Sequence, residues 1–432
     1  MKKVLLLGAI SPFCDLVNEI VKLGFEPIIC DYYTDAPAKK MGYPSFDVST
    51  MDVEALKRLA EEQGVDGVVS AFSDRNLMPA LHLCEKQKLN YFFNREIIEC
   101  LTDKKNMKEF FIHHNFPVVK YGIYEANKLK SELKDYRFPV VAKPIDAYGS
   151  KGIFVCQNAG EVLAVSEYVL KQSLKYSDKL IIEEFYCADE ISISAWVKSG
   201  EAYISCIYDV FRNFEDNVTL SAVSFPSKYT MTYLKEFKDL INKIVKRIGI
   251  TDGPVTLQCF IGDEGIKVSE LLCRLAGGSP YLYPTYFGGP NLAKMLVQNA
   301  VGDQIDYQNL IDFIPLNNSN KIFFDVQILV KAKGQIHYKI LEDEVKNKFK
   351  EIVDFRVYYP DGSELINTGN GVTFAKVICE LKKTDDYVDF IKRLEAAVKV
   401  YDDQGSEVQF IRIPDKLNIT KTYDINWDFM DK

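Results

Sequence analysis

The sequence predicts a fold of the mixed α/β and α+β class, built from three parts. A chain of 432 residues is too long for one hydrophobic core and corresponds to roughly three domains of ordinary size. Strands and helices alternate over residues 1–100, and a different pattern, rich in strands, begins near residue 306. We therefore expect a parallel α/β domain at 1–100, a central module at 101–305 and a C-terminal α+β domain at 306–432.

The first part reads as a parallel sheet covered by helices. Its strands KVLLLGA, FEPIICDY and DGVVSAF are continuous apolar runs, which is typical of strands buried on both faces. Gly8 follows the first strand without a GxGxxG motif, so a dinucleotide site is not favoured. The loop from Ser73 to Asn76, with Asp74 and Arg75, follows a strand at the edge where such folds bind ligands. A ligand contact and a solvated turn both stay open for this loop.

The segment 138–154, FPVVAKPIDAYGSKGIF, predicts two strands joined by a glycine-bearing hairpin. Lys143 ends the first strand, and glycines in the connection let backbone N–H groups approach phosphate oxygens. A neighbouring lysine adds a positive charge for a phosphate group. A Walker loop is excluded, because a strand rather than a helix resumes after the glycines.

Two further segments carry chemistry. The stretch GPVTLQCFIGDEGIKVSELL predicts two strands around a GDEG turn, with Gln258 and Glu270 on facing strands. Oxygen ligands on adjacent strands suit Mg²⁺, which keeps several waters and binds nucleotide phosphates. Upstream, Asp103 is placed to cap a helix that carries Lys104 in its first turn.

These motifs, in this order, resemble the ATP-grasp superfamily, in which a KPxxxxGSxG hairpin closes as a lid over ATP. The resemblance covers residues 1–300, and the variants look closest to carboxylate–amine ligases related to L-amino-acid ligase, carbamoyl-phosphate synthetase and biotin carboxylase. It implies a pre-ATP-grasp domain at the N-terminus, an ATP-grasp module with its lid at 138–200, and a C-terminal domain without catalytic motifs.

The resemblance also assigns roles to residues. ATP would be bound by Lys104, Lys143, Gly149, Ser150, Lys151, Gly152, the adenine hinge of Glu183, Glu184 and Phe185, and Glu190 at the ribose. Mg²⁺ would be held by Gln258 and Glu270, and catalysis would rest on Glu270 and Arg274. Leu272 stands where the family has an asparagine, and an apolar side chain cannot ligate a metal. A second Mg²⁺ is therefore held by fewer protein groups or is absent.

The expected activity is an ATP-dependent ligase that activates a carboxylate as an acyl phosphate and joins it to an amine or similar nucleophile. The alternative is an ATP-binding protein of the same fold with lost or reduced catalysis, which Leu272 motivates. Tyr281, Tyr283 and Tyr286 follow Arg274 in a glycine-rich loop, where they line a substrate pocket or pack at a domain boundary. Cys273 lies beside Arg274 without a histidine nearby in sequence to activate it.

Composition excludes several other classes. A net charge of −8 disfavours a nucleic-acid surface, which needs a basic face, and no apolar run reaches the length of a membrane span. Ten cysteines without a CxxC pair, and a start that reads as strand and helix rather than a signal peptide, predict reduced thiols in the cytoplasm. The expected partners are small-molecule carboxylate and amine substrates, and a homodimer stays open.

The C-terminal part should begin with a hairpin. FFDVQILVKAKGQIHYKIL reads as two paired strands closed by Lys333–Gly334, followed by further strands and the amphipathic helix in DDYVDFIKRLEAAVKV.

Overall fold

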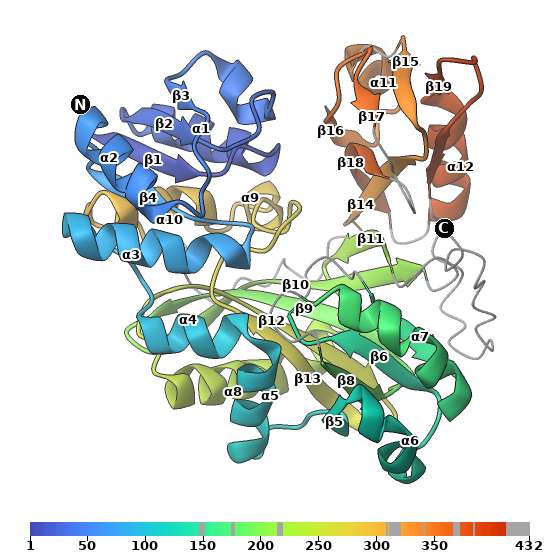
Figure 1. The fold of residues 1–432 in the computed structure, drawn as a ribbon. Helices are drawn as coiled ribbons and strands as arrows, with labels where there is room; N and C mark the ends of the chain where they lie inside the picture. Colours follow the sequence, from blue (N-terminus) through green and yellow to red (C-terminus); the bar gives the residue numbers. More distant parts are fainter. Residues whose placement is uncertain are drawn as a thin grey trace.

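The structure is a computed structural model that describes residues 1–146, 152–173, 178–213, 219–307, 310, 321–339, 342–365, 372–382 and 385–411 (Figure 1). Its N-terminal, central and C-terminal regions are the blue, cyan-to-yellow and orange-to-red parts of Figure 1. The fold class is confirmed: a parallel sheet lies at the N-terminus and antiparallel sheets form the rest. In the described residues, no helix combines the length and the apolar character that crossing a bilayer requires.

The N-terminal sheet has the order β3-β2-β1-β4, and all of its pairs are parallel. Its strands are β1 (Lys3–Leu7), β2 (Glu26–Cys30), β3 (Ser45–Phe46) and β4 (Gly67–Val69). Its helices are α1 (Pro12–Lys22), α2 (Val53–Gln63) and α3 (Leu77–Gln87), with short turns η1 (Pro37–Met41) and η2 (Asp74–Asn76). Helix α10 (Leu292–Ala300), far away in sequence, packs against α1 and β4 (Figure 1).

A second, four-stranded antiparallel sheet has the order β5-β8-β6-β7. Its strands are β5 (Tyr121–Glu125), β6 (Val140–Pro144), β7 (Phe154–Cys156) and β8 (Lys179–Glu184). Helices α6 (Leu129–Glu132) and α7 (Ala159–Lys171) and the turns η3 (Ala126–Lys128) and η4 (Leu133–Asp135) accompany it. Strands β6 and β7 pair as the predicted hairpin requires. This sheet spans residues 121–184, an earlier range than the lid expected at 138–200.

The largest sheet has nine strands and runs β13-β12-β9-β10-β11-β14-β18-β16, with β20 also paired to β14. The central region supplies β9 (Ala188–Lys198), β10 (Glu201–Asn213), β11 (Thr219–Phe225), β12 (Gly253–Gly262) and β13 (Gly265–Leu272). Helices α4 (Arg95–Thr102), α5 (Lys104–His113) and α8 (Thr230–Ile248) contribute to the core that covers one face of these strands. The opposite face, which holds Gln258 and Glu270, carries the candidate site.

The C-terminal region continues this sheet, because β14 pairs with β11. Its strands there are β14 (Lys321–Val330), β16 (Ile352–Val357), β18 (Val372–Lys382) and β20 (Gln409–Ile411). A three-stranded sheet joins β17 (Glu364–Leu365), β15 (Gly334–Tyr338) and β19 (Val400–Asp402), beside helices α11 (Glu342–Lys348) and α12 (Tyr387–Ala397).

The predicted hairpin around Lys333–Gly334 is wrong. Strand β14 pairs with β11, β18 and β20, whereas β15 pairs with β17 and β19. Two apolar runs separated by a short turn have the local signature of a hairpin. Here each run finds its partners elsewhere, because both edges of β14 are occupied by strands distant in sequence.

Candidate functional site

Helix α5 carries two lysines to the base of the site. Asp103 caps the helix, since its carboxylate accepts hydrogen bonds from the N–H groups of Lys105 (2.9 Å) and Asn106 (3.2 Å), as predicted. Lys104 and Lys108 lie one turn apart, so their side chains share a face. The side chain of Lys108 is only 2% exposed. Sequence reasoning proposed Lys104 and missed Lys108, although the spacing of four residues was a usable signal.

Glu183, near the end of β8, is the buried carboxylate that receives two of the site's lysines. Its side-chain oxygens lie 2.7 Å from Nζ of Lys143 and 2.5 Å from Nζ of Lys108. Lys143 is the penultimate residue of β6, and because Glu183 on β8 pairs with Val141, Lys143 is its diagonal neighbour on the same face of the sheet. The side chain of Glu183 is thus occupied by lysines, and its place in an adenine hinge, which concerns the backbone, stays a prediction.

Burial and charge act against each other at these groups. Burial on its own would raise the pKa of Glu183, but Lys108 and Lys143 hold that pKa down at about 2. Burial lowers the pKa values of Lys104 and Lys108, and the carboxylates of Glu183 and Glu270 counteract this for both lysines. The cluster is therefore a set of desolvated charges that stabilise one another.

The backbone N–H groups of the two residues after Glu183 donate hydrogen bonds to carbonyl groups of the protein. The N–H of Glu184 donates to the carbonyl of Lys120, and the N–H of Phe185 donates to that of Pro139, both at 2.9 Å. Glu184 also pairs with the exposed Arg137 at 3.0 Å. These two N–H groups are already engaged, so recognition of an adenine edge here would use carbonyl groups or the residues that follow.

Glu190, expected at a ribose, lies on β9 and pairs with Arg212 on β10. The guanidinium of Arg212 approaches both carboxylate oxygens, and its Nη2 lies 2.6 Å from Oε1 of Glu190. The two residues hold a bidentate geometry that sets the orientation of the carboxylate. The sequence did not identify Arg212.

Gln258 on β12 and Glu270 on β13 lie on facing strands, as predicted, and are directly opposite each other. Residues alternate between the two faces of a strand, and Leu271 and Cys273 belong to the core on the helix-covered face. Glu270 and Leu272 therefore share the site face. Leu272 is buried and lies opposite Thr256. The structure thus places an apolar side chain next to Glu270 on the face where metal ligands are needed.

Arg274 follows β13 and is fixed by Asp74 of the N-terminal region. Its Nε and Nη2 donate to the two carboxylate oxygens of Asp74, both at 2.7 Å. The loop around Asp74, which sequence left open between ligand contact and solvated turn, is thus an inter-region ion pair. The charge of Glu270 acts on Lys104, Lys108, Arg212 and Arg274, which places this carboxylate centrally among the cations.

The glycine loop is described only at its end. Gly149, Ser150 and Lys151 lie outside the described residues. Gly152 has φ +71°, and a Cβ there would meet Cγ of Gln172 at 2.9 Å. A side chain at this position is therefore excluded by both conformation and space.

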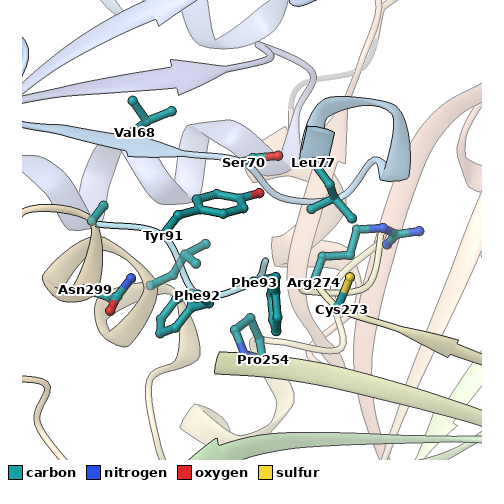
Figure 2. A pocket seen from close by; sticks show the side chains of 12 residues that line it. Val68, Ser70, Leu77, Tyr91, Phe92, Phe93, Pro254, Cys273, Arg274 and Asn299 are labelled. Carbon is teal, nitrogen blue, oxygen red and sulfur yellow. The ribbon is translucent and has the colours of Figure 1, made fainter. Parts of the chain in front are cut away.

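A small cavity lies behind Arg274, between the N-terminal sheet and β12 (Figure 2). The hydroxyls of Ser70 and Tyr91 point into the same space, close to Cys273 and Arg274. It has room for about one water molecule, which excludes it as a nucleotide site. Burial raises the pKa of Cys273 to about 12, so this thiol does not serve as a nucleophile.

The loop after Arg274 leads to a second charged group, at the junction with the C-terminal region. Tyr281 donates to Asp15 of α1 at 2.5 Å, and Nη1 of Arg356 lies 2.7 Å from the same carboxylate.

Tyr283 and Lys376 form a second group of the same kind, in which a tyrosine and a cation share one carboxylate. Both contact Oδ2 of the buried Asp325, at 2.7 and 2.8 Å respectively. Gly278 lies close to this pair, since a Cβ there would meet Nζ of Lys376 at 2.9 Å. Two of the three tyrosines after Arg274, Tyr281 and Tyr283, therefore anchor carboxylates where the regions meet, whereas Tyr286 stacks on Phe323.

No cluster of three or more histidine, cysteine, aspartate or glutamate side chains able to hold a metal occurs in the described ranges. The donor pair of Gln258 and Glu270 nevertheless fits one Mg²⁺ whose remaining ligands are phosphate oxygens and water.

Comparisons with known proteins agree with this geometry. Residues 136–279 match the ATP-grasp domain. The chain is 24% identical over 276 residues to a formate-dependent phosphoribosylglycinamide formyltransferase of Prochlorococcus marinus, covering 63% of this chain and 70% of that protein.

Two solved structures share the fold. The biotin carboxylase domain of 2-oxoglutarate carboxylase from Hydrogenobacter thermophilus, determined with MgADP and bicarbonate, has a TM-score of 0.75 at 18% identity and covers 100% of this chain and 95% of its own. L-amino acid ligase from Bacillus licheniformis has a TM-score of 0.73 at 14% identity, and the match covers 93% of this chain and 99% of the ligase.

At these identities the structural matches show the fold alone, and the domain match identifies residues 136–279. The predicted resemblance to the ATP-grasp superfamily is confirmed for residues 136–279, and the curated relative and the MgADP complex agree with the prediction of an ATP-dependent ligase that uses Mg²⁺. The ordered motifs and the family match together place an ATP-grasp domain at residues 136–279, within a fold that the chain shares with both solved structures.

Proposed function

We propose that this protein activates a carboxylate with ATP and transfers the acyl group to an amine or a similar nucleophile. One observation carries the proposal: a buried group of lysines around Glu183 adjoins the facing pair Gln258 and Glu270 on the large sheet. Cations suited to a polyphosphate thus lie beside oxygen ligands suited to Mg²⁺. Its substrates are small molecules.

The reaction consists of two substitutions. A carboxylate oxygen attacks the γ-phosphorus, the bond to the β-phosphate oxygen breaks, and ADP leaves. The amine then attacks the acyl carbon, the bond to phosphate breaks, and the amine loses a proton. Phosphorylation is needed because a free carboxylate has no adequate leaving group. The protein's share is to position the reactants and to balance charge.

We assign different parts of ATP binding to different residues. We assign Lys104 and Lys143 to the phosphates, the connection ending in Gly152 to the lid, and the segment from Glu183 to Phe185 to the adenine end. Glu190, oriented by Arg212, is our candidate for the ribose hydroxyls. Domain boundaries at 1–100, 101–305 and 306–432 remain our proposal, with the lid centred on the sheet of residues 121–184.

The metal would be held by Gln258 and Glu270, where it would neutralise charge on the transferring phosphoryl group. Arg274 lies at the end of the same strand pair and is oriented by Asp74. A guanidinium so held can stabilise the oxygen charge that develops on the phosphoryl group and later on the tetrahedral carbon. We therefore assign the catalytic roles to Glu270 and Arg274.

The test is to trap the activated acyl group. The protein is incubated with ATP, Mg²⁺, hydroxylamine and one carboxylate at a time, beginning with formate, which the curated relative uses according to its name. We expect ADP and a hydroxamate in equal amounts for the correct carboxylate, and neither product from Glu270→Gln. Hydrolysis of ATP without a hydroxamate for any carboxylate would contradict the proposal.

Leu272 supports a second candidate, an ATP-binding protein with little turnover. Its apolar side chain shares the face of Glu270, so one expected metal ligand is missing. Loss of one ion could remove several kcal/mol of charge stabilisation while leaving ATP binding intact. Tight ATP binding in calorimetry without ADP formation would make this candidate the better one.

A homodimer is also proposed, and equilibrium sedimentation tests it.

A further inference from the structure

Lys108 is a buried cation that the proposed function leaves without a role. It lies on α5, its side chain is 2% exposed, and its Nζ is 2.5 Å from Oε1 of Glu183. The other oxygen of Glu183 lies 2.7 Å from Nζ of Lys143. One carboxylate therefore binds two ammonium groups, one on each oxygen.

The position of Lys108 makes direct contact with a ligand implausible on geometric grounds. Its Nζ lies 5.0 Å from the centroid of the Tyr121 ring, and the side chain is enclosed between this ring and Glu183. Lys143, by comparison, ends β6 at the start of the glycine-bearing connection. Of the two lysines, Lys143 is the one placed to meet a phosphate.

The net charge of the cluster indicates a role for Lys108. A single lysine paired with Glu183 would form a neutral pair, and a neutral pair attracts a polyphosphate weakly. Two lysines around one carboxylate keep a net positive charge, and the second lysine draws the carboxylate toward itself. Such an arrangement also places a positive charge beside each oxygen of the buried carboxylate.

We propose that Lys108 is a positioning residue that holds Glu183 and so keeps the charge of Lys143 available to the nucleotide phosphates. This inference rests on the proposed function, in which Lys143 binds ATP. It adds a residue outside the nucleotide's reach that sets phosphate affinity through a shared carboxylate.

The experiment measures nucleotide affinities of Lys108→Met by calorimetry. We expect ATP and ADP to bind about tenfold more weakly, the size of effect of one charge acting over several ångströms in a partly buried site. Adenosine, which has no phosphate, should bind as it does to the wild type. Lys108→Arg should restore most of the ATP affinity, because it restores the charge.

Lys105→Met is the matched control. It removes the same charge from the same helix, but from a side chain that is 44% exposed and weakly paired to Glu109 at 3.9 Å. ATP affinity should stay unchanged in this variant. If Lys108→Met does not fold, Lys108→Gln replaces it and should show the same selective loss of ATP and ADP affinity.

The double variant Lys108→Met/Lys143→Met separates the outcomes. If Lys108 acts through Lys143, the double variant should bind ATP no more weakly than Lys143→Met alone. Wild-type ATP affinity in Lys108→Met, or an equal loss for adenosine and ATP, would overturn the inference while leaving the proposed function in place. Wild-type ATP affinity in Lys143→Met would overturn the phosphate assignment and the inference with it.

Discussion

The two ends of the site differ in how their charges are balanced. At the nucleotide end, three lysines surround the carboxylates of Glu183 and Glu270, which leaves a surplus of positive charge. At the junction of the regions, the cations Arg356 and Lys376 meet three carboxylates, Asp15, Asp354 and Asp325.

The difference separates binding from assembly. A cationic surplus attracts a polyanion, whereas the junction's cations are already paired with carboxylates, two of which also accept hydrogen bonds from tyrosines on the loop after Arg274. The nucleotide lysines and Glu183 also lie within the central region, while Asp15 and Arg356 are 341 residues apart. We expect the first group to determine nucleotide affinity and the second to hold the regions together.

The largest expected effect comes from Glu183→Gln. Removing this carboxylate leaves Lys108 and Lys143 buried without a counter-charge, and breaking a buried pair in this way costs about 3–5 kcal/mol. The free energy of unfolding, from urea denaturation, should fall by that amount. A loss below about 1 kcal/mol would show that water reaches the lysines and that the cluster is not desolvated.

Acid should remove the same contribution from the wild type. The pKa of Glu183 is lowered from its ordinary 4.5 to about 2, so its stabilisation is complete above pH 4.5 and is lost as the pH falls toward 2. The difference in unfolding free energy between wild type and Glu183→Gln should be constant at higher pH and shrink over this window. A difference that is independent of pH down to 2 would contradict the assignment.

Lys376→Met tests the junction. It leaves Asp325, which is 2% exposed, without its cation, and we expect a loss of about 3 kcal/mol in unfolding free energy. Affinity for ATP should not change, because Lys376 belongs to the assembly group. A large loss of ATP affinity in a folded variant would contradict the conclusion that the junction holds the regions together without determining nucleotide affinity.

Lys143→Met should have the opposite effect to Lys376→Met: a loss of ATP affinity in a protein that still folds. Glu183 keeps Lys108 as its partner, so the variant should fold, but one charge-assisted phosphate contact worth about 1.5–3 kcal/mol is lost. Calorimetry should show ATP affinity about 10- to 100-fold lower. Unchanged affinity would remove Lys143 from the nucleotide site.

The smallest effect is expected from Leu272→Asn, which adds an oxygen ligand beside Glu270. The Mg²⁺ concentration needed for half-maximal ADP formation should fall, provided that the buried pocket accepts a polar group. Thr256→Asn, on the facing strand, is a control for added polarity. An unaltered Mg²⁺ requirement in a folded Leu272→Asn protein would show that this position does not limit metal binding.

The sequence by itself determined the local features of this protein. Apolar runs and glycines predicted the parallel sheet and the strand pair β6–β7, and Asp103 predicted its own helix cap. Gln258 and Glu270 were predicted on facing strands around one tight turn, and a bulge beside Gln258 brings the two residues directly opposite each other. Each of these features depends on residues close together in the chain, where spacing alone fixes geometry.

Only the tertiary structure decided which charges are paired. The side chain of Glu183 is bound by Lys108 across 75 positions of sequence, and Arg274 is bound by Asp74 across 200. Strand β14 likewise takes partners far away in sequence instead of the adjacent β15. Buried charges and strand edges must be satisfied by whichever group the fold brings near, and sequence spacing does not encode that choice.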